Sequence, residues 1–218
     1  MTENSFCAPD ASCALCPRLV EFLQKNRRLY PDFHNAPVAS FGDLSARILV
    51  VGLAPGLKGA NRTGRPFTGD YAGDMLYPAL IRRGLANGVY QSRADDGVVL
   101  KDVRITNSVR CVPPENRPLP EESKACLNFL KQEVNAMPNL KAIFALGQAA
   151  HQAVLNVFNL KKKDFPFKHA FAHEFSVDGR AYCLVDTFHT SRRNVNTGKL
   201  TPDMFENALD VLQNALSR

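Results

Sequence analysis

The chain has 218 residues, of which 45% are hydrophobic and 22% are charged, and its formal net charge is +6. These values are ordinary for a globular protein with one substantial core, and the positive charge suits a polyanionic partner without requiring one. No stretch approaches the ~20 consecutive apolar residues of a membrane span. Residues 1–10 also lack a basic stretch followed by an apolar one, so we expect a cytoplasmic protein with no membrane partner.

Apolar runs alternate with amphipathic stretches along the chain. In chain order they predict a strand at 46–53, a helix at 73–86, a strand at 102–112, a helix at 119–137, a strand at 140–147, a helix at 148–158, a hairpin at 173–189 that turns at Asp178-Gly179, and a helix at 201–216. Pro78 predicts a late start or a kink in the first helix, and Thr201 is the expected N-cap of the last. This order predicts an α/β fold: a three-layer αβα sandwich with a central, mostly parallel sheet, in a single domain spanning 1–218.

Three segments that follow predicted strands carry the unusual residues of the sequence, at 52–70, 107–116 and 189–198. In parallel sheets ligands bind outside the carboxyl ends of the strands. We therefore expect these segments to meet in one crevice.

The first of these segments, "GLAPGLKGANRTGRPFTGD" (52–70), is rich in glycine, as phosphate-binding loops are. It does not have the spacing of a Walker A loop, because Gly56 comes one residue too early after Gly52 and no Ser or Thr follows Lys58-Gly59. It also does not open a helix at once, as a dinucleotide-binding turn does. Loops of this length in compact domains are usually functional, and its mixture of aromatic, amide, basic and acidic side chains suits a flat polar ligand.

Six cysteines are many for a cytosolic chain, in which thiols stay reduced, so metal binding is the leading explanation for some of them. Four of them form two pairs: Cys13 and Cys16 as C-x-x-C, and Cys111 and Cys126 on either side of "VPPENRPLPEESKA". Four thiolates can hold a structural zinc ion or a 4Fe–4S cluster, and pairing through a long loop favours the iron–sulfur site. Cys7 could compete as a ligand, whereas Cys183 in an apolar strand is expected in the core.

Three motifs and the four paired cysteines together match one known family. The segment 52–70 is similar to a G-(L/E)-A-P-G turn followed by N-R-T-G-R-x-F-T-G-D, and "TNSVRCVPPENRP" (106–118) is similar to T-x-x-V-(K/R)-C-x-P-P-x-N-(K/R)-P. The third, "HTSRRNVNTGKLT" (189–201), is similar to H-(P/V)-S-x-x-N-x-x-T-G-x-L-T. With these motifs the chain resembles the uracil-DNA glycosylases of the iron–sulfur branch, most closely family 5, the type B enzymes. Thr190 departs from the pattern, which usually has Pro or Val there.

The resemblance implies an enzyme that flips uracil out of DNA and hydrolyses its N-glycosidic bond, leaving an abasic site, in base excision repair. It extends to other deaminated bases such as hypoxanthine, and implies a monomer that holds a structural 4Fe–4S cluster at Cys13, Cys16, Cys111 and Cys126. The rival interpretation from the residues alone is a non-catalytic, four-cysteine metal-binding protein that binds nucleic acid. A nucleotide-binding enzyme that uses the 52–70 loop is a second rival.

The catalytic residues implied by the resemblance are His189, Asp70 and Asn116. His189 would donate a hydrogen bond to the O2 side of the departing base, where negative charge develops. Asp70 would orient or deprotonate the attacking water, and its alternative role is to cap the helix that follows. Asn116 and Asn107 are rivals for reading the base edge; the match favours Asn116 as the type B position, and both are kept.

The remaining expected contacts are with the base and with the DNA backbone. The backbone of Gly52, Leu53 and Ala54 would approach the flipped base, and Phe67 would stack on it unless it is only a core aromatic. The predicted DNA-binding residues, whose alternative is a solvated surface, are Arg62, Arg65, Arg192, Arg193 and Asn194.

Overall fold

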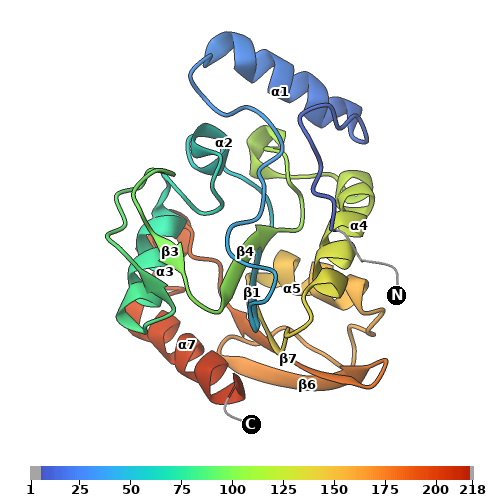
Figure 1. The fold of residues 1–218 in the computed structure, drawn as a ribbon, viewed down its shortest axis with the longest axis vertical. Coiled ribbons are helices and arrows are strands. Elements are labelled where there is room, and N and C mark those ends of the chain that lie inside the picture. The colour runs from blue at the N-terminus through green and yellow to red at the C-terminus, as the bar shows by residue number, and fades with distance from the viewer. Residues whose placement is uncertain (1–5, 217–218) are drawn as a thin grey trace.

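In the computed structural model, which describes residues 6–216, five strands form one sheet in the order β4-β1-β5-β7-β6 (Figure 1). These strands are β1 (Ile48–Gly52), β4 (Val103–Asn107), β5 (Ala142–Leu146), β6 (Phe171–Val177) and β7 (Arg180–Thr187). The first four strands in this order run parallel, and β6 pairs antiparallel with β7 at the edge. The mostly parallel α/β sheet predicted from the sequence is confirmed.

Helices cover both faces of the sheet because successive residues of each buried strand point to opposite faces. Ile48 and Val50 of β1 pack with helices α3 (Tyr71–Arg82) and α7 (Pro202–Leu216). Leu49 and Val51 pack on the other face with α4 (Pro120–Ala136) and α5 (Gln148–Val157). The sequence therefore folds into the three layers expected.

The local turn and cap signals are confirmed at two places. Val177 pairs with Arg180 across the β6–β7 hairpin, whose turn residues Asp178 and Gly179 both have positive φ. The hydroxyl of Thr201 accepts a hydrogen bond from the Met204 amide at 3.2 Å, as an N-cap does. The late start expected for the first helix is wrong, because α3 begins at Tyr71 and continues through Pro78.

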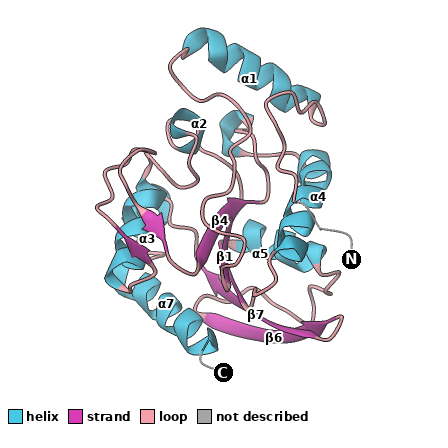
Figure 2. Cartoon of the chain, viewed as in Figure 1, coloured by secondary structure: helices cyan, strands magenta, loops and turns pink. Residues whose placement is uncertain are grey.

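Several elements are not predicted from the sequence. They are helix α1 (Pro17–Leu29), the short helices α2 (Ala60–Thr63), η1 (Pro114–Asn116) and α6 (Arg192–Asn196), and a ribbon of β2 (Ala86–Asn87) and β3 (Val99–Leu100). Figure 2 shows α1 apart from the sheet, at the end of the molecule toward which β4 points. Among residues 6–216 there is no helix with the length and apolar character needed to cross a membrane.

Candidate active site

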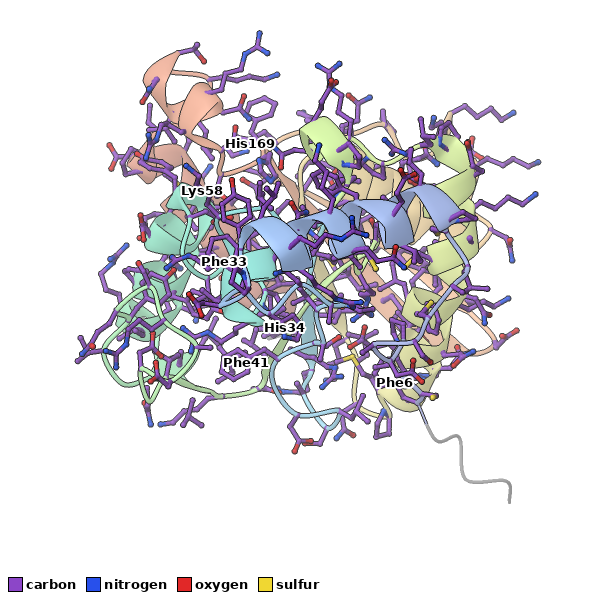
Figure 3. All side chains as sticks on the ribbon, turned by 90° about the horizontal axis from the view of Figure 1, so that it is seen from above. Phe6, Phe33, His34, Phe41, Lys58 and His169 are labelled. Carbon is purple, nitrogen blue, oxygen red and sulfur yellow. The ribbon has the colours of Figure 1, made fainter. Side chains whose placement is uncertain are left out.

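The three unusual segments meet in one pocket, as their positions after β1, β4 and β7 predict. Figure 3 looks down onto the end of the molecule that carries α1 and labels Lys58, which contributes to this pocket. The predicted residues that line it are Leu53, Ala54, Phe67, Asp70, Asn107, Asn116, His189 and Arg192. Residues far apart in the chain are thus brought together by the parallel sheet.

The floor of the pocket depends on the absence of a side chain at Gly52. A Cβ atom there would overlap both the ring of Phe67 and the amide oxygen of Asn107. Phe67 and Asn107 are 6% and 4% exposed, so neither can move aside freely. Glycine therefore allows an aromatic ring and an amide to lie against the end of β1.

Asp70 serves as a helix cap and also lines the pocket. Its carboxylate accepts a hydrogen bond from the Gly73 amide at 3.3 Å, at the N-terminus of α3. A Cβ at Gly59 would overlap this carboxylate, so the glycine loop makes room for it. Burial raises the pKa of Asp70, while the Gly73 amide and His189 oppose that rise. The two roles left open by the sequence are compatible in one side chain.

His189 follows β7 and faces the same pocket. Burial lowers its pKa, and the nearby negative charge of Asp70 opposes this shift only in part. The imidazole is therefore neutral at neutral pH and can donate a hydrogen bond from one ring nitrogen. The side chain of Asn194 donates to the His189 carbonyl at 2.8 Å and so fixes the backbone that carries the imidazole.

The two rival asparagines lie at different depths of this pocket. Asn107 is the last residue of β4 and is buried, whereas Asn116 ends η1, is exposed and has a φ of 56°. The structure thus brings both side chains to the pocket, with Asn107 at its floor and Asn116 nearer its mouth.

The predicted DNA-binding residues separate into exposed and enclosed ones. Arg192 and Arg193 are exposed on α6, and the Arg192 guanidinium lies 5.8 Å from the centre of the Tyr71 ring. Arg62 is exposed as well, although it also donates to the Lys58 carbonyl at 2.8 Å. Asn194 is partly buried, and its amide is used by the His189 loop itself.

Arg65, predicted as a DNA-binding residue, does not lie on the surface, so we do not propose it as a DNA contact. Its side chain is 6% exposed and forms an ion pair with Asp96 at 2.7 Å. The guanidinium also lies 4.8 Å from the centre of the Tyr77 ring. Although burial works against it, Arg65 holds the pKa of Asp96 at about 2. Arg65 therefore fastens the 52–70 loop to the 88–98 segment from within.

The four paired cysteines come together around a second recess. Cys13, Cys16, Cys111 and Cys126 line it with apolar residues such as Leu19 and Val109. Burial, and next the Cys126 thiol, raises the pKa of Cys16 to about 11 and that of Cys111 to about 12. The Arg110 amide donates to the Cys126 sulfur at 3.4 Å. Four converging thiols with an amide donor fit an iron–sulfur cluster or a zinc ion.

The other two cysteines have different surroundings. Cys183 is buried in β7, as expected of a core residue, and Cys7 is exposed. Neither residue is among those that line the four-cysteine recess.

Sequence reasoning missed several residues that line the pocket, and Lys58 and Tyr71 are among them. Both lie within or beside the 52–70 motif, so their position next to Gly59 and Asp70 could have indicated them. Lys58 is exposed and adds a positive charge to the mouth of the pocket.

Comparison with known proteins gives one consistent family. The model of the uracil DNA glycosylase superfamily matches residues 39–213. The chain is 42% identical over 220 residues to the type-5 uracil-DNA glycosylase of Thermus thermophilus, covering 99% of this chain and 97% of that protein. It is 41% identical to the type-5 enzyme of Pyrobaculum aerophilum, covering 91% of this chain and 86% of that protein. A type-4 uracil-DNA glycosylase of the same organism is 30% identical, covering 77% of this chain and 82% of that protein. The pocket geometry and these similarities together place the chain in the uracil DNA glycosylase superfamily, among the type-5 uracil-DNA glycosylases.

Proposed function

We propose that this protein flips a deaminated base, first of all uracil, out of DNA and hydrolyses its N-glycosidic bond, leaving an abasic site for base excision repair. The observation that carries the proposal is the single pocket in which Phe67, Asn107, Asp70 and His189 meet at the carboxyl ends of the parallel strands. An extrahelical base can reach such a pocket, whereas a stacked one cannot.

The base is held between an aromatic ring and amide groups. Phe67 offers a buried ring for stacking, and Asn107 beside it offers a donor and an acceptor for the base edge. Asn116 reaches the base or its sugar from the mouth of the pocket. The backbone of Leu53 and Ala54, which line the pocket, and of Gly52 beside them completes the site. The missing side chain at Gly52 makes room for the Phe67 ring and the Asn107 amide that hold the base.

Bond cleavage leaves negative charge on the departing base and positive charge on the sugar. A neutral His189 donates a hydrogen bond to the oxygen on which the negative charge develops, which stabilises the transition state more than the ground state. Asp70 orients the attacking water and accepts its proton, and its charge also stabilises the cationic sugar. Because the base departs early in such a reaction, His189 contributes more to the rate than Asp70.

Arg192, Arg193 and Arg62 are the proposed contacts to the DNA backbone. All three are exposed, and Arg192 lines the pocket, so a strand whose base enters the pocket passes beside it. Phosphate contacts of this kind make affinity depend strongly on salt concentration.

We assign a 4Fe–4S cluster to Cys13, Cys16, Cys111 and Cys126. Hydrolysis needs no electrons, so the cluster serves to tie the start of α1 to α4 and to the segment after β4. Iron and sulfide analysis, with the visible absorbance of the purified protein, tests the assignment. Zinc in place of iron in the protein as isolated would contradict it and would favour a zinc module.

The substrate range is proposed to include hypoxanthine. The pocket floor uses backbone, one ring and one amide, and these groups can accept bases of different shape better than a set of directed side chains could. The test is release of free base, detected by chromatography, from duplexes that carry one uracil or one hypoxanthine. Release of uracil alone would contradict the proposed activity on hypoxanthine. Release of neither base would contradict the glycosylase assignment.

A further inference from the structure

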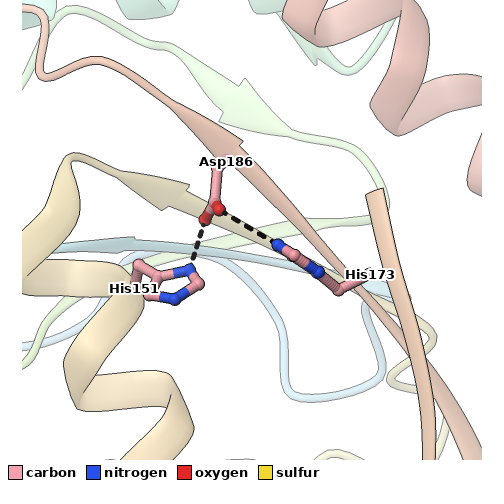
Figure 4. A group of neighbouring side chains, drawn as sticks. All are labelled: His151, His173 and Asp186. Atoms are coloured by element: carbon pink, nitrogen blue, oxygen red, sulfur yellow. Dashed lines mark hydrogen bonds and ion pairs between the residues drawn. The ribbon is translucent and has the colours of Figure 1, made fainter. Parts of the chain in front are cut away.

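Asp186 is fully buried in β7, three residues before His189, and the proposed mechanism does not use it. Its carboxylate lies between two buried histidines (Figure 4). One oxygen is 2.8 Å from Nδ1 of His151, and the other is 3.5 Å from Nε2 of His173. A buried charge is costly unless it is paired and hydrogen-bonded, so this group must have a role in holding the structure around it.

The three side chains lie close enough to share a metal ion, with one ligand atom from each within 4.8 Å of the others. Both histidines also lie within hydrogen-bond distance of backbone carbonyls. Nε2 of His151 is 3.0 Å from the Phe165 carbonyl, and Nε2 of His173 is 3.1 Å from the Pro166 carbonyl. The cluster thus fastens the segment before β6 onto β7.

Asp186 also holds the next residues of that segment, on both sides of His169. Its carboxylate accepts a hydrogen bond from the Lys168 amide at 3.3 Å, and its backbone carbonyl accepts one from the Ala170 amide at 2.8 Å. These two hydrogen bonds hold the backbone on either side of His169 against β7.

His169 in turn contacts the residue that precedes His189. Its Nδ1 accepts a hydrogen bond from the Phe188 amide at 3.2 Å, and the two rings stack with centroids 4.7 Å apart. Burial lowers the pKa of His169, which favours a neutral ring with one nitrogen free to accept. The Phe188 amide points at Nδ1 and so favours the tautomer in which Nδ1 is that acceptor. His169 is labelled in Figure 3, which looks onto the end of the molecule that carries α1.

We propose that Asp186 is a positioning residue for His189: by fixing His169 it fixes Phe188, and so the backbone from which the His189 imidazole enters the pocket. The inference rests on the proposed function, in which His189 acts on the departing base. A displacement of the imidazole of about 1 Å is enough to cost on the order of a hundredfold in rate.

The first test compares Asp186→Asn with Asp102→Asn, the same substitution at the opposite end of the sheet, where Asp102 caps the Arg47 amide. We expect Asp186→Asn to lower the single-turnover cleavage rate on uracil-containing duplex at least tenfold while leaving DNA affinity unchanged. Asp102→Asn should leave both unchanged. In a His189→Ala background, Asp186→Asn should cause no further loss of rate. Full activity of Asp186→Asn, or an equal loss in both backgrounds, would overturn the proposal.

A second pair of variants covers the case in which Asp186→Asn does not fold. His169→Phe keeps the stacked ring but removes the acceptor, whereas His169→Asn keeps an acceptor oxygen close to the place of Nδ1. We expect His169→Asn to retain more activity than His169→Phe. Equal activity of the two would contradict the role of the hydrogen bond.

A third readout does not depend on activity, so that the inference and the proposed function can fail separately. The Phe188 amide should be protected from hydrogen exchange in the wild type and should exchange faster in Asp186→Asn and His169→Phe. Unchanged exchange would overturn the positioning role even in an active enzyme. If the wild-type protein carried one non-iron metal ion per chain and Asp186→Asn lost that ion, the three side chains would form a metal site. This result would also overturn the positioning role.

Discussion

His189 and Asp70 share one pocket, and burial moves their pKa values in opposite directions. It lowers the pKa of the histidine and raises that of the aspartate, and each residue partly opposes the shift of the other. At neutral pH this leaves a neutral imidazole facing a carboxylate, which is the combination that anion stabilisation and water activation require.

Substitution of these two residues should rank their contributions. We expect His189→Ala to lower the single-turnover rate on the order of 10³-fold, because a preorganised donor is lost from the transition state. Asp70→Ala should cost less, on the order of tenfold to a hundredfold, because water activation matters less when the base departs first. Comparable or reversed losses in the same assay would contradict this ranking.

Asp70 should also lower the stability of the protein at neutral pH. Its pKa is raised on folding, so the charged form is disfavoured in the folded state at pH values above the raised pKa. Asp70→Asn retains an oxygen that can cap Gly73 and removes the buried charge. We expect its melting temperature to rise by about 2 °C at pH 7.5, and the gain to shrink as the pH is lowered.

The matched control for this change is Asp203→Asn, which alters an exposed aspartate in the first turn of α7. It should leave the melting temperature unchanged at both pH values. A lower melting temperature for Asp70→Asn at pH 7.5 would show that its charge stabilises the fold.

At the scale of single residues, the sequence predicts which residues line the pocket better than it predicts which residues face solvent. The motifs predict Asp70, Phe67 and His189 at the site, and all three line the pocket. Arg65 is predicted to contact DNA, but its partner Asp96 lies 31 residues further along the chain. No local pattern indicates such a long-range ion pair.

At the scale of single elements, α6 is the proposed contact to the DNA backbone. Its Ser191 cap accepts the Asn194 amide at 3.3 Å, which holds Arg192 and Arg193 on an exposed turn beside the pocket. Removal of one phosphate-binding side chain should reduce the slope of log affinity against log salt by about 0.9.

We therefore expect the Arg192→Ala, Arg193→Ala double variant to reduce this slope by about 2, measured by fluorescence anisotropy on duplex DNA. Lys141→Ala is the control, because Lys141 lies at the amino end of β5, at the end of the sheet opposite the pocket. An unchanged slope for the double arginine variant would contradict the proposal that α6 contacts the DNA backbone.

The cysteine recess joins α1 to α4, two helices that are far apart in the chain. Replacement of Cys126, which is buried against Leu19 and Val109, should remove a ligand and open this recess. We expect Cys126→Ser to lower iron content and melting temperature together. Cys183→Ser, in the core of β7, is the comparison, since it should lower stability without loss of iron. A Cys126→Ser variant that is colourless but as stable and active as the wild type would contradict a structural cluster.

Elements with strong periodicity were predictable, and those that depend on tertiary contacts were not. Strands β1 and β5 are continuous apolar runs, β4 alternates β-branched residues, and α7 has both a cap and a regular apolar stripe. Helix α6 is five residues long and α2 is four, too short to form without the loops that hold them. Helix α1 buries only a narrow stripe that includes Leu19 and Leu23, which gives a weak signal.

For the molecule as a whole, the parallel sheet explains why distant motifs form one site. The alternation of strands and helices predicted a mostly parallel sheet, and the carboxyl ends of β1, β4 and β7 therefore lie on one edge of that sheet. The network of Asp186 and three histidines was not predictable, because it depends on the path of the segment before β6.

Three histidines also contribute to the way in which the stability of the molecule depends on pH. Burial lowers the pKa of His169, His173 and His189 below the ordinary value of 6.5. Each therefore contributes stability that is fully present above pH 6.5 and is lost as the pH falls through its lowered pKa. We expect a lower melting temperature at pH 5.5 than at pH 7.5, and an equal or higher one would contradict these shifts.

The most direct test of the glycosylase activity and its site is a single-turnover assay on a labelled duplex with one central uracil, followed by alkali to cut abasic sites. We expect a cleaved strand with the wild-type protein and a rate lower by orders of magnitude with His189→Ala. No cleavage by wild-type protein that carries its full iron content would contradict the glycosylase assignment. Equal rates for the two proteins would contradict the role given to His189.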